Sequence, residues 1–236
     1  MGNELISIIT PFKNSSKYLD ECLNSIINQS YKDWELIIVD DYSTDKSFEI
    51  VKEFAFIDKR IKLYRNNKKG IIGALKLGYN LSVGKYITRM DSDDVMHVDK
   101  LQELCHNLKK KGNGFLATSA VKYFSSNRLG NGYKNYQNWI NWLMMKNNHF
   151  EHIYKECVIP SPNWMISRKD FDKIEFSFFS ISISNTSKDK PSPSAKSTKP
   201  LRSAKANSLI TPGAFITLKF SIFSFELDFE SSIIEV

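Results

Sequence analysis

Three carboxylates follow directly on a short apolar segment in the middle of the chain. Residues 86–90 predict a buried strand, and Asp91, Asp93 and Asp94 come immediately after it. Acidic groups gathered at the end of a strand repel one another unless a cation or a donor compensates their charge. Carboxylate oxygens are the ligands that Mg²⁺ and Mn²⁺ prefer. We therefore expect Asp93, helped by Asp91, to hold one of these cations against a diphosphate; a solvated loop that caps the next helix is the alternative.

Polar and aromatic residues also follow the first two predicted strands. Residues 5–9 lead into Thr10-Pro11-Phe12, and residues 34–39 lead into Asp40-Asp41. An aromatic such as Phe12 can stack on a base, and a carboxylate such as Asp41 can accept a hydrogen bond from a base or a ribose. Because the carboxyl ends of parallel strands share one edge, the three strand ends predict a nucleotide site. Phe12 as a core residue and Asp40-Asp41 as helix caps are the alternatives.

The elements that would position these residues alternate along the first half of the chain. Apolar runs predict strands at 5–9, 34–39, 61–64, 86–90 and about 115–124, and helical spacing of apolar residues falls between them. We expect Ser15 or Ser16, and then residues 43–45, to cap the first two helices, and Val98 to begin the apolar face of a later one. The pattern predicts an α/β fold: a Rossmann-type, mostly parallel sheet with helices on both faces.

Composition narrows the class of protein. The net charge of +7 over 236 residues suits anionic partners such as nucleotide-sugars or an acidic membrane face, and we expect no nucleic-acid partner. Three distant cysteines predict neither a disulfide framework nor a zinc site. We see no signal peptide or membrane span, which predicts a cytoplasmic protein; peripheral contact with the inner membrane face is compatible with this location. No glycine fingerprint of dinucleotide oxidoreductases follows the first strand, and Gly70, Gly73 and Gly78 indicate helix packing.

The last third of the chain differs from the rest. Aromatic residues at 133–142 predict a helix, which either faces the core or offers a platform for an acceptor sugar. Residues 177–208 are rich in serine and lysine and predict disorder, whereas 209–236 are apolar and β-prone. We interpret 1–174 as one domain, with its nucleotide-sugar half at 1–125, and 175–236 as an atypical, partly disordered tail. An altered or frameshifted terminus, or a linker followed by a docking hairpin, would explain the tail.

Three blocks of the sequence resemble family 2 of the glycosyltransferases. They are residues 8–14 (IITPFKN), residues 30–43 (SYKDWELIIVDDYS) and residues 84–95 (GKYITRMDSDDV), the last followed by Asp99-Lys-Leu101. Their order and spacing match over about residues 1–125. Residues 156–166 also look like a segment that some bacterial members carry, and beyond about residue 174 the likeness stops.

The resemblance implies a GT-A-type fold, a nucleotide-diphosphate sugar donor, a divalent metal and inversion at the anomeric carbon. By position, Thr10 and Phe12 would border the base and Asp41 would hold the base or the ribose. Asp91 would position the ribose or the metal, and Asp93 would ligate the metal. Lys69 and Arg89 would be neighbours of the diphosphate.

One part of the family pattern is missing. Members usually supply the general base for the acceptor from a later acidic pair, and this chain has none after residue 174 except Glu226 and Asp228 in a β-like run. The leading hypothesis is an inverting glycosyltransferase that acts on a polysaccharide or glycolipid acceptor. The alternative is an inactive nucleotide-sugar-binding remnant, truncated or frameshifted after about residue 174.

Overall fold

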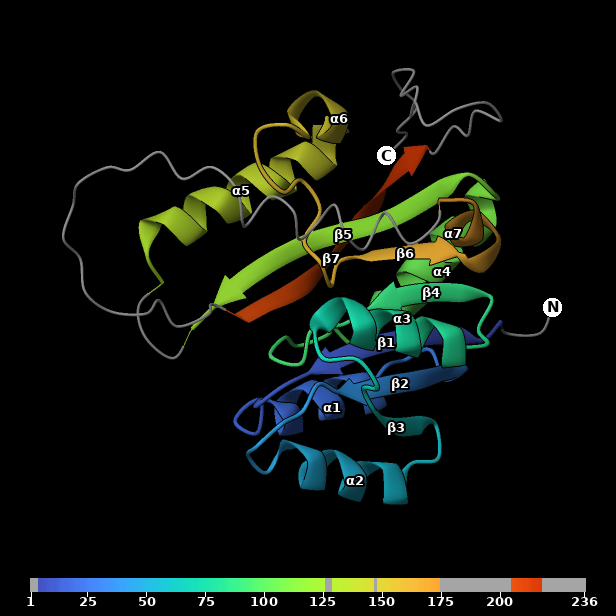
Figure 1. Cartoon of the computed structure of the whole chain (residues 1–236). Coiled ribbons are helices and arrows are strands. Elements are labelled where there is room, and N and C mark those ends of the chain that lie inside the picture. Colours follow the sequence, from blue (N-terminus) through green and yellow to red (C-terminus); the bar gives the residue numbers. More distant parts are fainter. Residues whose placement is uncertain (1–3, 126–128, 147, 175–204, 218–236) are drawn as a thin grey trace.

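The fold is built on one sheet with helices packed against it (Figure 1). The computed structural model describes residues 4–125, 129–146, 148–174 and 205–217, the last of these by backbone alone. Seven strands lie in the order β3-β2-β1-β4-β6-β5-β7. Their bounds are β1 Ile6–Phe12, β2 Trp34–Asp40, β3 Ile61–Arg65, β4 Tyr86–Arg89, β5 Phe115–Phe124, β6 Trp164–Ser167 and β7 Lys205–Thr217.

The sheet changes its pairing pattern halfway across. The strands β3, β2, β1 and β4 are parallel to one another, whereas β6 is antiparallel to both β4 and β5. It follows that β5 runs in the same direction as β1–β4, and β7 runs against it. The predicted α/β class and mostly parallel sheet are therefore confirmed. The carboxyl ends of five strands, including β5, lie toward one edge of the sheet.

Helices cover both faces of the sheet. They are α1 Leu19–Ile27, α2 Ser47–Ile57, α3 Ile71–Leu81, α4 Lys100–Lys111, α5 Asn131–Lys146, α6 His149–His152 and α7 Arg168–Ile174. Apolar residues of α1, α2 and α4 pack with Ile6 and Ile8 of β1. Residues of α3 and α7 pack on the opposite face, with Ile9. A Cβ on Gly78 would lie 2.6 Å from Ile9 Cγ2, which confirms helix packing as the role of that glycine.

Some local predictions are wrong. The α1 helix has no side-chain hydrogen bond at its N-cap, and Ser15 instead uses its hydroxyl on Lys13 and Ser92. The capping predicted for residues 43–45 is confirmed, because Asp45 Oδ1 accepts from the N–H of Ser47, the first residue of α2, at 3.0 Å. Val98 precedes α4, is 46% exposed and accepts a backbone hydrogen bond from Ser30.

The chain after residue 174 is described only in part. Residues 205–217 form β7, which includes the last four residues of the stretch 177–208; the disorder predicted for that stretch stays a prediction. The rest of the predicted tail, residues 175–204 and 218–236, lies outside the described residues, as do Glu226 and Asp228.

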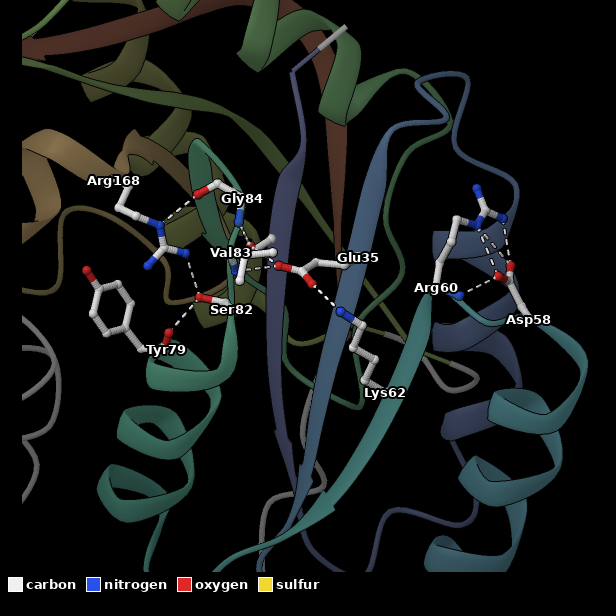
Figure 2. A network of polar contacts seen from close by, with 10 residues as sticks. Glu35, Asp58, Arg60, Lys62, Tyr79, Ser82, Val83, Gly84 and Arg168 are labelled. Atoms are coloured by element: carbon white, nitrogen blue, oxygen red, sulfur yellow. Dashed lines mark hydrogen bonds and ion pairs between the residues drawn. The ribbon is translucent and has the colours of Figure 1, made fainter.

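The amino-terminal edge of the sheet contains a closed polar network (Figure 2). Glu35 is 3% exposed and its Oε1 accepts hydrogen bonds from the Ser7 hydroxyl at 2.6 Å and from the Val83 N–H at 2.7 Å. Its Oε2 receives the Lys62 ammonium at 2.8 Å. These donors lower the pKa of Glu35, although burial acts in the opposite direction. Each oxygen of the buried carboxylate therefore has a partner.

Arg168 completes this network from the start of α7. Its guanidinium donates to the Gly84 carbonyl at 2.8 Å and to the Ser82 hydroxyl at 2.7 Å, and it lies over the Tyr79 ring (Figure 2). These contacts tie α7 to the turn that leads into β4, so the amino-terminal edge holds the two halves of the sheet together.

Candidate functional site

The carboxyl ends of β1, β2 and β4 meet at one edge of the sheet. The N–H of Asp41, just after β2, donates to the Phe12 carbonyl at the end of β1 at 2.8 Å. On the other side of β1, the N–H of Met90 donates to the Ile9 carbonyl at 3.1 Å. The predicted meeting of the three strand ends therefore exists in the structure.

The loops that follow these strands are joined by serine side chains. Ser15, three residues after β1, has its hydroxyl 2.8 Å from the hydroxyl of Ser92, which lies between Asp91 and Asp93. The Ser15 N–H donates to the Ser47 hydroxyl at 2.7 Å, which ties the same loop to the start of α2. Phe12, Asp41 and Asp93 accordingly belong to three connected loops on one side of the molecule.

Asp41 is fixed by two donors. Its Oδ1 accepts from the Asn66 amide at 2.7 Å and from the Gly70 N–H at 2.8 Å, and the residue is 7% exposed. Gly70 has a φ of +118°, which favours glycine, and Asn66 also donates to its carbonyl. The predicted residue Lys69 is exposed and lies next to this pair. Sequence reasoning missed Asn66. Asn66 directly follows β3 just as Asp41 directly follows β2, so the position after a strand could have identified both residues.

Two carboxylates of residues 91–94, which we call the acidic loop, differ in their pairing. Arg89, the last residue of β4, has a side chain only 7% exposed, and its Nε donates to Asp91 Oδ1 at 2.8 Å. Arg89 thus anchors Asp91. Asp93 is partly exposed and makes no hydrogen bond or ion pair within the described ranges. Its carboxylate is available for an external ligand.

A buried lysine lies beside the acidic loop. Lys100 is the first residue of α4, is 5% exposed and donates to the Pro162 carbonyl at 2.5 Å. Burial lowers its pKa to about 8, and the negative charges of Asp94 and Asp91 oppose this shift. A cation at the start of a helix is opposed by the helix dipole, so the carboxylates are what favour it there. Sequence reasoning used Lys100 only as part of the family resemblance.

Thr10 and Phe12 are placed in the core. Both lie on the face of β1 that carries Ile8, because side chains alternate along a strand. Phe12 is 3% exposed and packs in the same cluster as Ile8, and Thr10 is fully buried with no partner for its hydroxyl among the described residues. The structure therefore favours the core alternative for Phe12, although a role beside a base stays a prediction.

The aromatic ring exposed at this edge belongs to another residue, Tyr42. It follows Asp41, is 50% exposed and has a φ of +62°. Asn14, in the loop after β1, has a φ of +48°. Non-glycine residues seldom adopt this conformation, and such strain gathers at functional sites. Sequence reasoning missed Tyr42, because backbone strain is not visible in residue order.

The carboxylates suit a cation whose ligands come partly from the protein and partly from a substrate. Within the described ranges, no three His, Cys, Asp or Glu side chains lie close enough to form a complete metal cage. Mg²⁺, however, is usually held by one or two carboxylates together with substrate phosphates and water. The free Asp93 and its neighbour Asp91 provide that kind of donor set.

Comparison with known proteins decides the family. A sequence model described as "Glycosyl transferase family 2" matches residues 7–175, which is more than half of the chain. The chain belongs to glycosyl transferase family 2. The resemblance drawn from the three sequence blocks is confirmed.

Curated relatives support the same assignment. Glycosyltransferase GlyG of Streptococcus pneumoniae serotype 4 is 37% identical over 132 residues, which cover 56% of this chain and 43% of that protein. The putative teichuronic acid biosynthesis glycosyltransferase TuaG of Bacillus subtilis is 34% identical over 115 residues, covering 48% of this chain and 46% of that protein. The chain therefore matches less than half the length of either relative.

A solved structure supports the fold. The mannosyltransferase PcManGT from Pyrobaculum calidifontis, in complex with GDP-Man and Mn²⁺, matches with a TM-score of 0.56 and 19% identity. The match covers 72% of this chain and 46% of that protein. This likeness agrees with the GT-A architecture of the family. Among the described helices, none combines the length and the apolar character that crossing a membrane requires.

Proposed function

We propose that this chain binds a nucleotide-diphosphate sugar at the carboxyl edge of its sheet and transfers the sugar, with inversion, to a polysaccharide or glycolipid acceptor. One observation carries the proposal: the loops after β1, β2 and β4 are hydrogen-bonded into one edge, where Asp93 keeps a carboxylate that has no partner in the part of the chain that the structure describes. Membership of family 2 supplies the reaction class.

The nucleoside is assigned to the β1–β2 side of this edge. Asp41 is held rigidly by Asn66 and Gly70 through one oxygen, so its other oxygen can accept a hydrogen bond from a base or ribose. Thr10 and Phe12 are buried at the end of β1 and would support the base from the core side. Lys69, exposed beside Gly70, can reach toward a diphosphate as a cation.

The diphosphate is assigned to the acidic loop. Asp93 and Asp91 would hold Mg²⁺ or Mn²⁺ there, and this cation would neutralise the charge that develops on the departing nucleoside diphosphate. Arg89 keeps the Asp91 carboxylate in place through its ion pair. The net charge of +7 agrees with work at an anionic inner membrane face, and this location remains a prediction.

Thermal unfolding with candidate donors tests the proposal. UDP-, GDP- and dTDP-sugars are added one at a time, each with and without Mn²⁺, because a ligand that binds only the folded state raises its melting temperature. We expect one nucleotide series to raise the melting temperature, more so with Mn²⁺, and Asp93→Asn to lose the Mn²⁺-dependent part. The proposal is wrong if no nucleotide stabilises the protein.

A second candidate function is a nucleotide-sugar-binding remnant without transferase activity. The observation in its favour is that the family match ends at residue 175 while no general base has been identified in the chain. Donor binding without transfer to any acceptor would favour the remnant. Release of nucleoside diphosphate that speeds up on addition of a saccharide acceptor would favour the transferase.

A further inference from the structure

A row of aromatic rings runs along the helix that follows β5. We call it the aromatic ladder, and its members are Tyr123, Tyr133, Tyr136, Trp139, His152 and Trp142. The Tyr123 ring lies 5.9 Å from Tyr133 and 6.1 Å from Tyr136, and Tyr136 lies 5.8 Å from Trp139. The ladder therefore continues from a strand onto a helix through successive ring contacts.

The far end of the ladder is a group of three rings. His152 of α6 stands edge-on to Trp139 at 6.0 Å and to Trp142 at 5.9 Å. Trp142 is 43% exposed, and the other ladder members are half-buried. Core packing of the aromatic positions, the alternative favoured by their helical spacing, is thus only partly correct: the buried side chains of α5 are Ile140, Leu143 and Met144.

The helix that carries the ladder is fixed to an open stretch of β5. The pairing of β6 with β5 ends at Thr118, so the next residues of β5 lack a strand partner on that side. The Asn141 amide fills this place by accepting from the Val121 N–H and donating to the Val121 carbonyl, both at 2.9 Å. Gln137 accepts from the Tyr123 N–H at 2.7 Å. Two amide side chains therefore hold α5 in a fixed register against the strand.

The ladder begins at the edge proposed for the sugar donor. β5 runs in the same direction as β4, so Tyr123, near the end of β5, lies toward the edge that carries the acidic loop. Burial raises the pKa of Tyr123 to about 12, and the negative charge of Asp94 contributes to that shift. As Figure 1 shows, α5 then runs back along β5, away from this edge.

A second connection joins the ladder to the donor edge through Cys157. The Tyr136 hydroxyl donates to the Cys157 carbonyl at 2.7 Å, which fixes the orientation of that ring. Burial raises the pKa of the Cys157 thiol, whereas the positive charge of Arg89 acts to lower it. The Arg89 that anchors Asp91 is therefore within electrostatic reach of the segment that supports the ladder.

We propose that the aromatic ladder binds the saccharide acceptor, with the sugar to be extended at the Tyr123 end and the rest of the chain stacked toward Trp142. This inference rests on the proposed function and assigns its acceptor-binding surface. Sugar rings present apolar C–H faces and polar rims, which match aromatic faces bordered by hydrogen-bonding groups. The exposed residues Asn135 and Asn138 on α5 supply such groups. The ladder is elongated and contains no Asp, Glu, Lys or Arg side chain, which suits a sugar chain better than a charged headgroup.

Binding to immobilised oligosaccharides on a glycan microarray tests the inference with the full chain. We expect the native protein to bind a subset of glycans, and Trp142→Ala and Trp139→Ala each to weaken that binding about tenfold, which corresponds to about 1.4 kcal/mol. Nucleotide-dependent thermal stabilisation should remain unchanged in both variants. Tyr154→Ala is the matched control, because Tyr154 is 97% exposed and outside the ladder.

The possible outcomes separate this inference from the proposed function. No glycan binding by the native protein, equal loss in the Tyr154→Ala control, or binding to anionic phospholipid vesicles that Trp142→Ala abolishes would each overturn the ladder assignment. Ladder-dependent glycan binding without any nucleotide stabilisation would uphold the ladder and remove the donor function. Circular dichroism melting of each variant shows that its fold is kept.

Discussion

The two edges of the sheet use polar residues in opposite ways. At the amino-terminal edge, the buried carboxylate of Glu35 is matched by donors on both oxygens, and Arg168 binds a carbonyl, a hydroxyl and a ring face. At the carboxyl edge, Asp93 has no partner among the described residues, and the Thr10 hydroxyl is buried without one. The polar groups named at the amino-terminal edge are already paired with one another. Those at the carboxyl edge can still bind a ligand.

Backbone geometry shows the same contrast. Two non-glycine residues of the described ranges have a positive φ, Asn14 and Tyr42, and both follow strands at the carboxyl edge. The amino-terminal edge instead uses a glycine where space is short, because a Cβ on Gly84 would lie 2.5 Å from the Ser7 hydroxyl oxygen. Among the described residues, positive φ at non-glycine positions is therefore confined to the edge assigned to the substrate, which is the arrangement expected of a functional site.

The largest expected effect concerns Asp93. We expect Asp93→Ala to reduce sugar transfer about a thousandfold, because a charge pair at 4 Å contributes roughly 4 kcal/mol at an effective dielectric near 20. The melting temperature of the protein alone should stay unchanged, since this carboxylate has no partner within the described residues. Transfer rates at saturating donor and Mn²⁺ measure the effect. The exposed Asp20 on α1 provides the control, and near-normal turnover of Asp93→Ala would remove the metal assignment.

An intermediate effect is expected at the opposite edge. Glu35→Ala should lower the free energy of unfolding by about 2–4 kcal/mol, because the Ser7 hydroxyl and the Val83 N–H each lose a buried acceptor. Urea denaturation at pH 7 measures the loss, with the exposed Glu49→Ala as control. Unfolding that matches the native protein would show that the network in Figure 2 does not hold the edge together.

The same carboxylate predicts a pH dependence. Folding lowers the pKa of Glu35 from its ordinary value of 4.5, so its charge adds stability above that pH and loses it as the pH falls through the lower folded value. The stability difference between the native protein and Glu35→Gln should therefore narrow below about pH 4.5. A difference that stays constant down to pH 3 would contradict this account.

The smallest effect concerns backbone strain. Tyr42→Gly should raise the free energy of unfolding by about 0.5–1 kcal/mol, because a left-handed conformation costs a non-glycine residue roughly 1–2 kcal/mol and the gain is reduced by the entropy of glycine. Tyr42→Ala removes the same ring but keeps the strain, so it should show no such gain. A glycine variant no more stable than the alanine variant would show that the site is unstrained.

The sequence predicted best those features that depend on burial pattern. β5 was expected at 115–124 and is found there, and the apolar spacing located the helix that carries the ladder. Asp41, Asp91 and Asp93 were selected because they follow predicted strands. In a parallel sheet, the residues that follow the strands lie at one edge. These features depend on the spacing of apolar and polar residues, which can be read from one amino-acid sequence.

Features decided by tertiary contacts were missed. The hydroxyl of Ser15 was expected to cap α1 but contacts Ser92, 77 residues away in sequence. Phe12 was expected to stack on a base, with a core position as the alternative; the period-two alternation that places Ile8 in the core also places Phe12 there, and the role beside a base stays a prediction. The reversed direction of β6 depends on how the chain returns to the sheet, which no local pattern reports.

The enclosed ammonium group of Lys100 has a consequence for the reaction cycle. The Lys100 charge interacts with those of Asp94 and Asp91, so the acidic loop has an internal counter-ion that favours its present shape. Product and metal could then depart together while the loop keeps its shape. The next donor would meet a preformed receptor and would bind without the entropic cost of ordering that loop.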